Sequence, residues 1–125
     1  MRQRPVPARD DADRQRRLQG VRWQVAEMAE RVDTARLLTL RAADGADRGS
    51  DVRREMSMAK IRATQAAVDN ANDAVQLHGG VGYKTERHVE RYLRDARLLT
   101  IAGGPNETHR DDLADAVFER GADGA

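Results

Sequence analysis

Apolar side chains recur every three or four residues along the first third of the chain. The repeat runs through Leu18, Val21, Val25, Met28, Val32 and Ala35. Side chains at this spacing lie on one face of an α-helix. The pattern therefore predicts a long helix over residues 13–44. Its predicted C-terminal stop is Asp44-Gly45, because glycine readily adopts the left-handed conformation that ends helices.

A second apolar repeat follows a short turn at residues 47–50 and continues to about residue 77. It consists of Met58, Ile61, Val68, Ala71 and Val75. Alanines flank these positions, and their small side chains let a neighbouring helix approach closely. Ser50 is the predicted N-cap of this helix, and Asp51 is the acidic residue of its first turn. Because the turn is short, the two long helices are predicted to lie antiparallel.

Two glycine clusters bracket a third, shorter helix. The first cluster, HGGVGY at residues 78–83, is predicted to end the second long helix and to open a loop. The second cluster, GGP at residues 103–105, follows a charged helix predicted over residues 86–98. Glycine loses more backbone entropy on folding than any other residue, so two clusters in one small chain need a reason. The simplest reason is a helix C-cap followed by a turn.

The chain is predicted to end in a fourth helix whose first residue is Pro105, where the missing N–H of proline costs nothing. The N-terminus of such a helix favours an anion. No strand-like alternation occurs, so the sequence predicts an all-α fold of two long antiparallel helices and two shorter helices. The predicted organisation is a flexible arm at residues 1–12, one helical domain at residues 13–120 and a tail at residues 121–125.

The composition narrows the possible functions. The chain has 125 residues, with 22 basic and 21 acidic side chains. A nucleic-acid-binding protein usually gathers a basic excess on one face, whereas here the two signs alternate, as is typical of solvated helix surfaces. DNA binding is favoured only by the short basic run RQRR near the start. The absence of cysteine excludes disulfides, cysteine-ligated zinc and a cysteine nucleophile.

Neither a targeting leader nor a membrane anchor is predicted. Residues 1–17 lack the apolar core of a secretory signal, and their aspartates argue against an organellar transit peptide. No apolar run approaches the roughly 18–20 residues that a membrane-spanning helix needs. We therefore expect a cytoplasmic protein that does not enter a membrane.

Few side chains could perform chemistry by themselves. The histidines, His78, His88 and His109, do not form an HExxH-type motif, so no metal site is predicted and hydrogen-bonded or solvated histidines are favoured. The two serines, Ser50 and Ser57, do not lie in a G-x-S-x-G turn, so no serine nucleophile is predicted. The first glycine cluster is not a Rossmann fingerprint, because it follows a helix and not a strand.

Three stretches carry a more specific pattern. They are DAVQLHGGVGY at residues 73–83, VERYLRDARLLTI at residues 89–101 and IAGGPNE at residues 101–107. Together they resemble the C-terminal helical domain of the acyl-CoA dehydrogenases, flavoproteins that desaturate acyl-CoA thioesters. The resemblance extends over about residues 18–117. It implies the C-terminal four-helix bundle of that family.

The resemblance implies that both glycine clusters contact FAD, largely across a subunit interface. The residues that it implicates are Gln76, Leu77, His78, Gly79, Gly80, Pro105, Asn106 and Glu107. The implied parent reaction is the FAD-dependent α,β-dehydrogenation of an acyl-CoA, an oxidoreductase activity. The implied partner that shares the FAD is a second copy of the chain or a fuller acyl-CoA dehydrogenase subunit.

Four departures from the family pattern bear on activity. Many relatives carry their catalytic glutamate base where Gly103 stands, although the isovaleryl and long-chain types also have a small residue there. The family's Arg-x-x-Phe-Gly segment is not preserved in ARDDADRQRR at residues 8–17, and the family's loop hydroxyl residue is replaced by Pro105. The family's N-terminal helical domain and middle β-domain have no counterpart in the sequence. No catalytic residue is therefore assigned.

Two functions remain as hypotheses. The first is an acyl-CoA dehydrogenase-like flavoprotein fragment or small subunit, which completes the flavin site of a partner, binds acyl-CoA within the complex and is inactive alone. The alternative is a non-catalytic helical oligomerisation or interaction protein derived from the same domain. Both predict self-association or binding to a partner, because the aliphatic seams exceed what four helices can cover.

Overall fold

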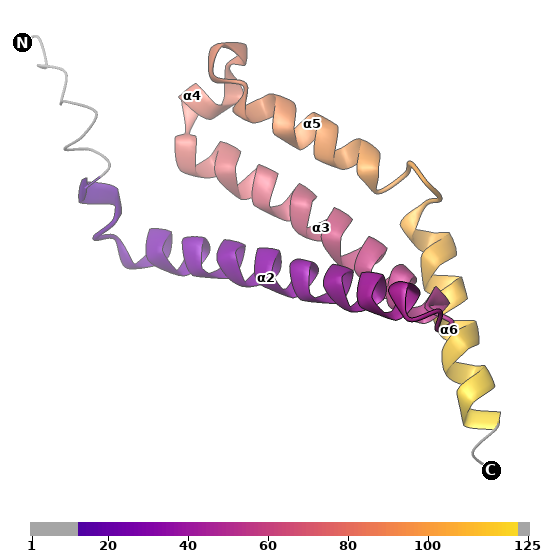
Figure 1. The fold of residues 1–125 in the computed structure, drawn as a ribbon. Coiled ribbons are helices and arrows are strands. Elements are labelled where there is room, and N and C mark those ends of the chain that lie inside the picture. Colours follow the sequence, from indigo (N-terminus) through magenta and orange to yellow (C-terminus); the bar gives the residue numbers. More distant parts are fainter. Residues whose placement is uncertain (1–12, 123–125) are drawn as a thin grey trace, which may run out of the picture.

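The computed structural model describes residues 13–122 (Figure 1). A single helical turn at residues 13–15 precedes the main helices. These are α2 (Gln19–Asp47), α3 (Arg53–His78), α4 (Gly80–Tyr83), the 3-10 helix η1 (Thr85–Arg87), α5 (Val89–Leu99) and α6 (Asn106–Ala122). No strand occurs within the described residues, and the all-α prediction is confirmed. The predicted arm at residues 1–12 lies outside these residues, and the first two residues of the predicted tail belong to α6.

The long helix α3 is the centre of the fold. It runs antiparallel to α2, as predicted, and lies between α2 and α5 (Figure 1). The last helix, α6, crosses the N-terminal half of α3 at a steep angle (Figure 1). All three of these helices pack directly on α3. Both glycine clusters therefore connect helices that pack on α3.

The turn between α2 and α3 begins later than predicted. α2 continues through Gly45, and the left-handed residue is Gly49, with φ of 72°. The Ser50 N–H closes the helix by donating to the Gly45 carbonyl at 3.0 Å. A Cβ at Gly45 would lie 2.7 Å from Val52 Cγ1. The predicted stop at Gly45 was wrong, because close packing and not backbone conformation requires glycine there.

The N-terminal cap of α3 also differs from the prediction. The N-cap residue is Val52, and it makes no side-chain cap hydrogen bond. Asp51, which precedes it, accepts a hydrogen bond from the Arg53 backbone N–H at 3.2 Å. The acidic residue of the first turn is Glu55. The prediction that Ser50 caps α3 was therefore wrong, and Asp51 caps the helix from just outside its first turn.

The first glycine cluster ends α3, as predicted, and then forms a helical turn in place of the predicted loop. Gly79, with φ of 58°, breaks α3, and α4 begins at the next residue. Gly82 is buried against α3, where a Cβ would lie 2.7 Å from the Val75 carbonyl oxygen. After η1, the left-handed residue His88 starts α5. The prediction of a loop missed this turn because the packing of Gly82 onto α3 leaves no trace in the local sequence.

The core of the described residues consists of small side chains. Its buried apolar members are Ala42, Ala59, Ala66, Ala71, Val89 and Ala96. Within residues 13–122 no large side chain is fully buried, whereas Trp23, Leu37 and Phe118 are 62%, 68% and 74% exposed. The alanines let the helices approach closely, as predicted. The chain nevertheless leaves much of its large apolar surface uncovered.

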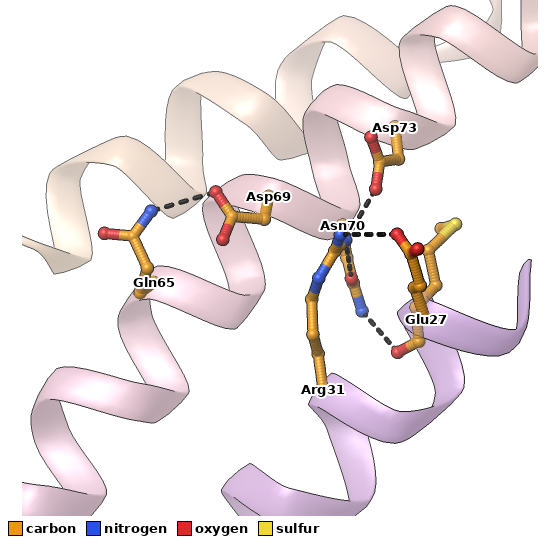
Figure 2. Close-up of polar contacts among 7 residues, drawn as sticks. Glu27, Arg31, Gln65, Asp69, Asn70 and Asp73 are labelled. Carbon is orange, nitrogen blue, oxygen red and sulfur yellow. Dashed lines mark hydrogen bonds and ion pairs between the residues drawn. The ribbon is translucent and has the colours of Figure 1, made fainter. Parts of the chain in front are cut away.

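A polar cluster joins α2 to α3 (Figure 2). Arg31 of α2 pairs with Asp73 of α3 at 2.5 Å and donates to Asn70 Oδ1 at 3.1 Å. Asn70 Nδ2 donates in turn to the Met28 carbonyl oxygen at 2.9 Å. The hydrogen bond from the Arg31 guanidinium lowers the pKa of the Asp73 carboxyl below its ordinary value. Such directional contacts constrain the register of two helices in a way that alanine packing does not.

Candidate functional site formed by two glycine loops

The sequence-predicted cofactor residues fall into two groups at different places along α3. Gln76, Leu77 and His78 end α3 and lead into the first glycine loop, residues 79–83. Pro105 is the last residue of the second glycine loop, residues 100–105, and Asn106 and Glu107 follow it at the start of α6. Asn106 of this group contacts α3 at Thr64. The twelve residues from Thr64 to Gln76 span about 18 Å at about 1.5 Å per residue, so the two groups do not form one pocket in this chain.

The first glycine loop is accessible from outside the chain. Gln76, His78, Gly79 and Gly80 are exposed, and Leu77 is half-buried. A Cβ at Gly79 or Gly80 would meet no atom within 4 Å. Gly79 needs glycine for its φ of 58°, but Gly80 has neither a positive φ nor a close neighbour. Nothing in the described chain requires glycine at Gly80, so the space beside it is open to another molecule.

The second glycine loop turns the chain from α5 into α6. Gly103 and Gly104 have φ of 70° and 92°, a left-handed conformation that favours glycine. α6 begins at Asn106, one residue after the predicted start at Pro105. The first intrahelical bond of α6 runs from the His109 N–H to the Pro105 carbonyl at 3.4 Å. The N–H groups of the preceding turn have no carbonyl partner within the helix.

The Asn106 side chain is turned towards the interior. It is 3% exposed, and its Nδ2 donates to Thr64 Oγ1 at 2.9 Å. The Thr64 hydroxyl donates to the Lys60 carbonyl at 2.9 Å. The flanking residues Pro105 and Glu107 are exposed. The Asn106 side chain thus joins α6 to α3, and Pro105 and Glu107 are the accessible members of the second group.

Two side chains that the sequence analysis did not assign to a site hold the second loop. Lys60 of α3 donates to the carbonyl oxygen of Leu99 and, at 2.7 Å, to that of Ala102. His109 of α6 donates through Nε2 to the Gly103 carbonyl oxygen at 3.2 Å. With its proton on Nε2, the ring accepts a hydrogen bond at Nδ1 from the Ser57 hydroxyl, 3.5 Å away.

One sequence signal could have identified this side of α3. Ser57, Lys60 and Thr64 are spaced by three and then four residues, so they lie on one helix face. Polar residues at this spacing on an otherwise alanine-rich face indicate a polar contact with another element. The sequence could not show that the element is the second glycine loop.

The contact between Ser57 and His109 is structural. Ser57 is 3% exposed and therefore inaccessible to a substrate. Asp112 Oδ2 lies 4.0 Å from Nδ1 of His109, the same nitrogen that faces Ser57. A catalytic triad needs the acid and the nucleophile on opposite ring nitrogens. This arrangement therefore does not provide an activated serine.

Within residues 13–122, no group of three or more histidine, aspartate or glutamate side chains is placed to hold a metal ion. In the same part of the chain, no helix combines the length and the hydropathy that crossing a bilayer requires. The two glycine loops are the candidate site that remains.

Both glycine loops lie within the part of the chain that matches known proteins. The sequence matches the family profile described as "Acyl-CoA dehydrogenase, C-terminal domain" over residues 8–118. An acyl-CoA dehydrogenase of Bacillus subtilis (strain 168) is 48% identical over 92 residues, which cover 74% of this chain and 24% of that protein. The chain spans about a quarter of the length of the curated relatives that it matches.

Solved structures show the same helical arrangement. Butyryl-CoA dehydrogenase from Megasphaera elsdenii superposes with a TM-score of 0.81 at 30% identity, covering 82% of this chain and 27% of that one. The FAD complex of PigA superposes with a TM-score of 0.81 at 26% identity, covering 95% of this chain and 30% of the other.

Proposed function

Because the chain belongs to the acyl-CoA dehydrogenase family, whose C-terminal domain it matches over residues 8–118, we propose that it contributes part of an FAD site that it shares with a partner subunit. The parent reaction is the FAD-dependent α,β-dehydrogenation of an acyl-CoA thioester. FAD, when bound, supplies the hydride acceptor. The chain supplies backbone groups that bind and orient the cofactor.

The open backbone of the glycine loops is the observation that carries this proposal. No atom lies within 4 Å of a Cβ built at Gly79, Gly80 or Gly103. A flat or phosphate-bearing ligand can therefore approach the main chain closely. The N-terminal turn of α6 adds N–H groups without a partner inside the helix and a partial positive charge, which favour a phosphate. A dinucleotide fits both features.

The distance between the loops supports a site that is shared between chains. Separated by about 18 Å along α3, the loops would contact distant parts of one extended cofactor or two different cofactors. The rest of each binding site would come from another subunit. The exposed side chains of Trp23, Leu37 and Phe118 leave apolar surface for such a subunit, which is a second copy or a fuller acyl-CoA dehydrogenase chain.

We assign no catalytic base to this chain. By the resemblance of IAGGPNE to the family's loop, Gly103 occupies the position of the usual glutamate. The imidazole of His109, which lies beside this loop, already bonds the Gly103 carbonyl and the Ser57 hydroxyl. The chain alone is therefore expected to be inactive towards acyl-CoA.

The alternative function is a non-catalytic helical oligomerisation or interaction protein. The buried side chain of Asn106 favours it, because that side chain is bonded to Thr64 and is not available to a cofactor. The proline at Pro105 is a second feature in its favour, because it has no N–H to donate. In this alternative the apolar helix faces bind a partner, and the glycine loops only connect helices.

Flavin binding distinguishes the two functions. The chain is purified alone and after co-expression with a full-length acyl-CoA dehydrogenase encoded nearby, and the flavin absorbance of each sample is measured. We expect flavin in the complex and little in the chain alone. If neither sample retains flavin, the cofactor proposal fails and the interaction protein is favoured.

A pair of matched variants tests whether the first loop contacts the flavin. Gly80→Val places a side chain in the open space of the loop, whereas Gly20→Val does so on α2, where a Cβ likewise meets no atom within 4 Å. We expect the complex to lose flavin with Gly80→Val and to keep it with Gly20→Val. Equal flavin content in the two complexes would argue against a contact at the first loop.

A further inference from the structure

The last turns of α3, which lead into the first glycine loop, are tied to α2 by one arginine. Arg31 of α2 donates through the same nitrogen, Nη1, to Asn70 Oδ1 at 3.1 Å and to Asp73 Oδ2 at 2.5 Å (Figure 2). Its Nη2 lies 3.4 Å from Glu27 Oε2 of its own helix. The side chains of Arg31 and Asp73 are only 26% and 19% exposed, so solvent screens their attraction less than that of a surface pair.

These contacts fix α3 against α2 in two respects. Asn70 Nδ2 donates to the Met28 carbonyl oxygen, which sets the position of α3 along α2. Arg31 holds both Asn70 and Asp73, which lie three residues apart on neighbouring turns, and so it sets the rotation of α3 about its own axis. The apolar contacts between the two helices do not fix this rotation, because apolar packing is not directional.

The direction of the Gln76 side chain depends on this rotation. Successive residues of an α-helix are turned by about 100°, so Gln76 points about 60° to one side of Asp73, one turn further along. Gln76 is exposed, and within residues 13–122 its side chain makes no hydrogen bond of its own. Its direction is therefore set by the helix that carries it.

We infer that Arg31 is a positioning residue, which orients the end of α3 so that the Gln76 side chain is presented to the bound FAD. The inference rests on the proposed function, in which Gln76 belongs to the FAD site. Arg31 bonds protein groups and acts on the site through Asn70 and Asp73.

The first test needs no cofactor. Hydrogen exchange is measured by mass spectrometry on the full chain for wild type, Arg31→Met and Arg41→Met. Arg41 is the matched control, because it pairs with Glu55 of α3 at 3.4 Å at the other end of the same two helices. In Arg31→Met, we expect the amides of residues 74–79 to exchange about tenfold faster, the scale for losing a hydrogen bond to a charged group. Arg41→Met should leave these amides unchanged.

A folded Arg31→Met chain with wild-type exchange over residues 74–79 would overturn the inference, and so would an equal acceleration there in Arg41→Met. If Arg31→Met does not fold, Asn70→Leu tests the same cluster from α3. It removes the acceptor for Arg31 and the donor to the Met28 carbonyl. Wild-type exchange in that variant would overturn the inference equally.

The second test asks whether Arg31 acts through Gln76. In the complex with a full-length partner, the affinity for FAD is measured for wild type, Arg31→Met, Gln76→Ala and the double variant. We expect about tenfold weaker binding in each single variant. The double variant should bind FAD no more weakly than Gln76→Ala, because Arg31 then has no side chain left to position. Arg31→Lys, which keeps a charged donor, should recover part of the lost affinity.

Additive losses in the double variant would show that Arg31 acts independently of Gln76 and would overturn the inference. Unchanged FAD affinity in Arg31→Met would overturn it as well.

The two tests separate failure of the inference from failure of the proposed function. If the wild-type complex binds no flavin, the proposed function fails, and the exchange experiment on the ligand-free chain still determines whether Arg31 fixes the end of α3. If the wild-type complex binds flavin and the two losses are additive, the proposed function stands and only the inference fails.

Discussion

The first glycine loop is held by its own backbone, whereas the second is held by side chains from two other helices. In the first loop the Gly79 N–H donates to the Gln76 carbonyl at 3.1 Å, and the Gly82 N–H donates to the Gly79 carbonyl at 2.9 Å. In the second loop, the carbonyl oxygens of Ala102 and Gly103 accept hydrogen bonds from Lys60 of α3 and His109 of α6. Two similar glycine clusters therefore differ in how far the chain itself orders them.

This difference has a consequence for function. The second loop is held by side chains of the same chain, so we expect its conformation to depend little on a ligand. Among the described residues, the first loop accepts no comparable hydrogen bond from a side chain of another helix. The Arg31–Asp73 pair, which joins α2 to α3, lies one turn before Gln76 (Figure 2). We therefore expect the first loop to depend more on a partner or a ligand for its final conformation.

The largest expected effect is at Gly82, the one point where the first loop is tightly packed. A Cβ there would lie 2.7 Å from both the His78 Cβ and the Val75 carbonyl oxygen. Gly82→Ala should lower the free energy of unfolding, measured by urea denaturation, by about 1–3 kcal/mol. Gly80→Ala is the control and should change it little. Equal losses at both positions would show that this packing does not hold the loop.

The next effect concerns the anchor of the second loop on α3. Asn106→Ala removes a buried side chain that is bonded to Thr64. We expect it to lower the free energy of unfolding by about 2 kcal/mol, because a buried polar group loses its partner. The neighbouring change Glu107→Gln, at an exposed position, should stay within about 0.5 kcal/mol. If Asn106→Ala changes the free energy of unfolding as little as Glu107→Gln does, the hydrogen bond to Thr64 does not hold the second loop.

A smaller effect is expected from backbone conformation alone. Gly103 has a φ of 70° and open space around it, so Gly103→Ala adds strain without a clash. Left-handed alanine costs about 1 kcal/mol, which should appear as a lower melting temperature. Gly20→Ala, in the helical part of α2, should have the opposite sign, because alanine favours a helix over glycine by about 0.5–1 kcal/mol. Stability changes of the same sign would contradict this assignment.

The smallest effect is a pH dependence near the first loop. Arg31 lowers the pKa of Asp73, so the folded state binds this proton less readily than the unfolded state. The pair thus stabilises the fold above the ordinary aspartate pKa of 3.8, and this contribution is lost as the pH falls through the lower folded-state value. Asp73→Asn should therefore be less stable than wild type at pH 7, and the difference should shrink below about pH 4.

Urea denaturation of both proteins between pH 7 and pH 3 measures this difference. The control is Asp69→Asn, because the Asp69 carboxylate accepts its hydrogen bond from Gln65 of the same helix, at 2.9 Å (Figure 2). A difference between wild type and Asp73→Asn that stays constant over the whole range would contradict a role for the Asp73 charge.

The helices could be predicted from the sequence because their signal is local. The apolar repeat ending near Leu77 predicted the end of α3 to within one residue, since α3 ends at His78. The same approach misplaced the end of α2. In the sequence, Gly45, which packs against Val52, cannot be told from a glycine that ends a helix. A local pattern shows where glycine occurs, but not which physical demand it satisfies.

The candidate site could be predicted only in part. The two glycine clusters are visible in the sequence, and their family resemblance supplies the expectation of FAD. The support of the second loop is not visible there, because Lys60 and the Leu99 carbonyl that it bonds are separated by 39 positions. The inward orientation of Asn106 was also not foreseeable, since it depends on where α6 crosses α3.

The sequence by itself determined that the chain is helical, that its long helices run antiparallel and that two glycine clusters interrupt them. These properties follow from the spacing of apolar residues and from the conformational freedom of glycine, both of which act between near neighbours. Only the tertiary structure decided which glycines serve packing, which serve a left-handed turn and which leave the backbone open. Those roles depend on the approach of distant segments to α3, and a one-dimensional pattern does not contain that geometry.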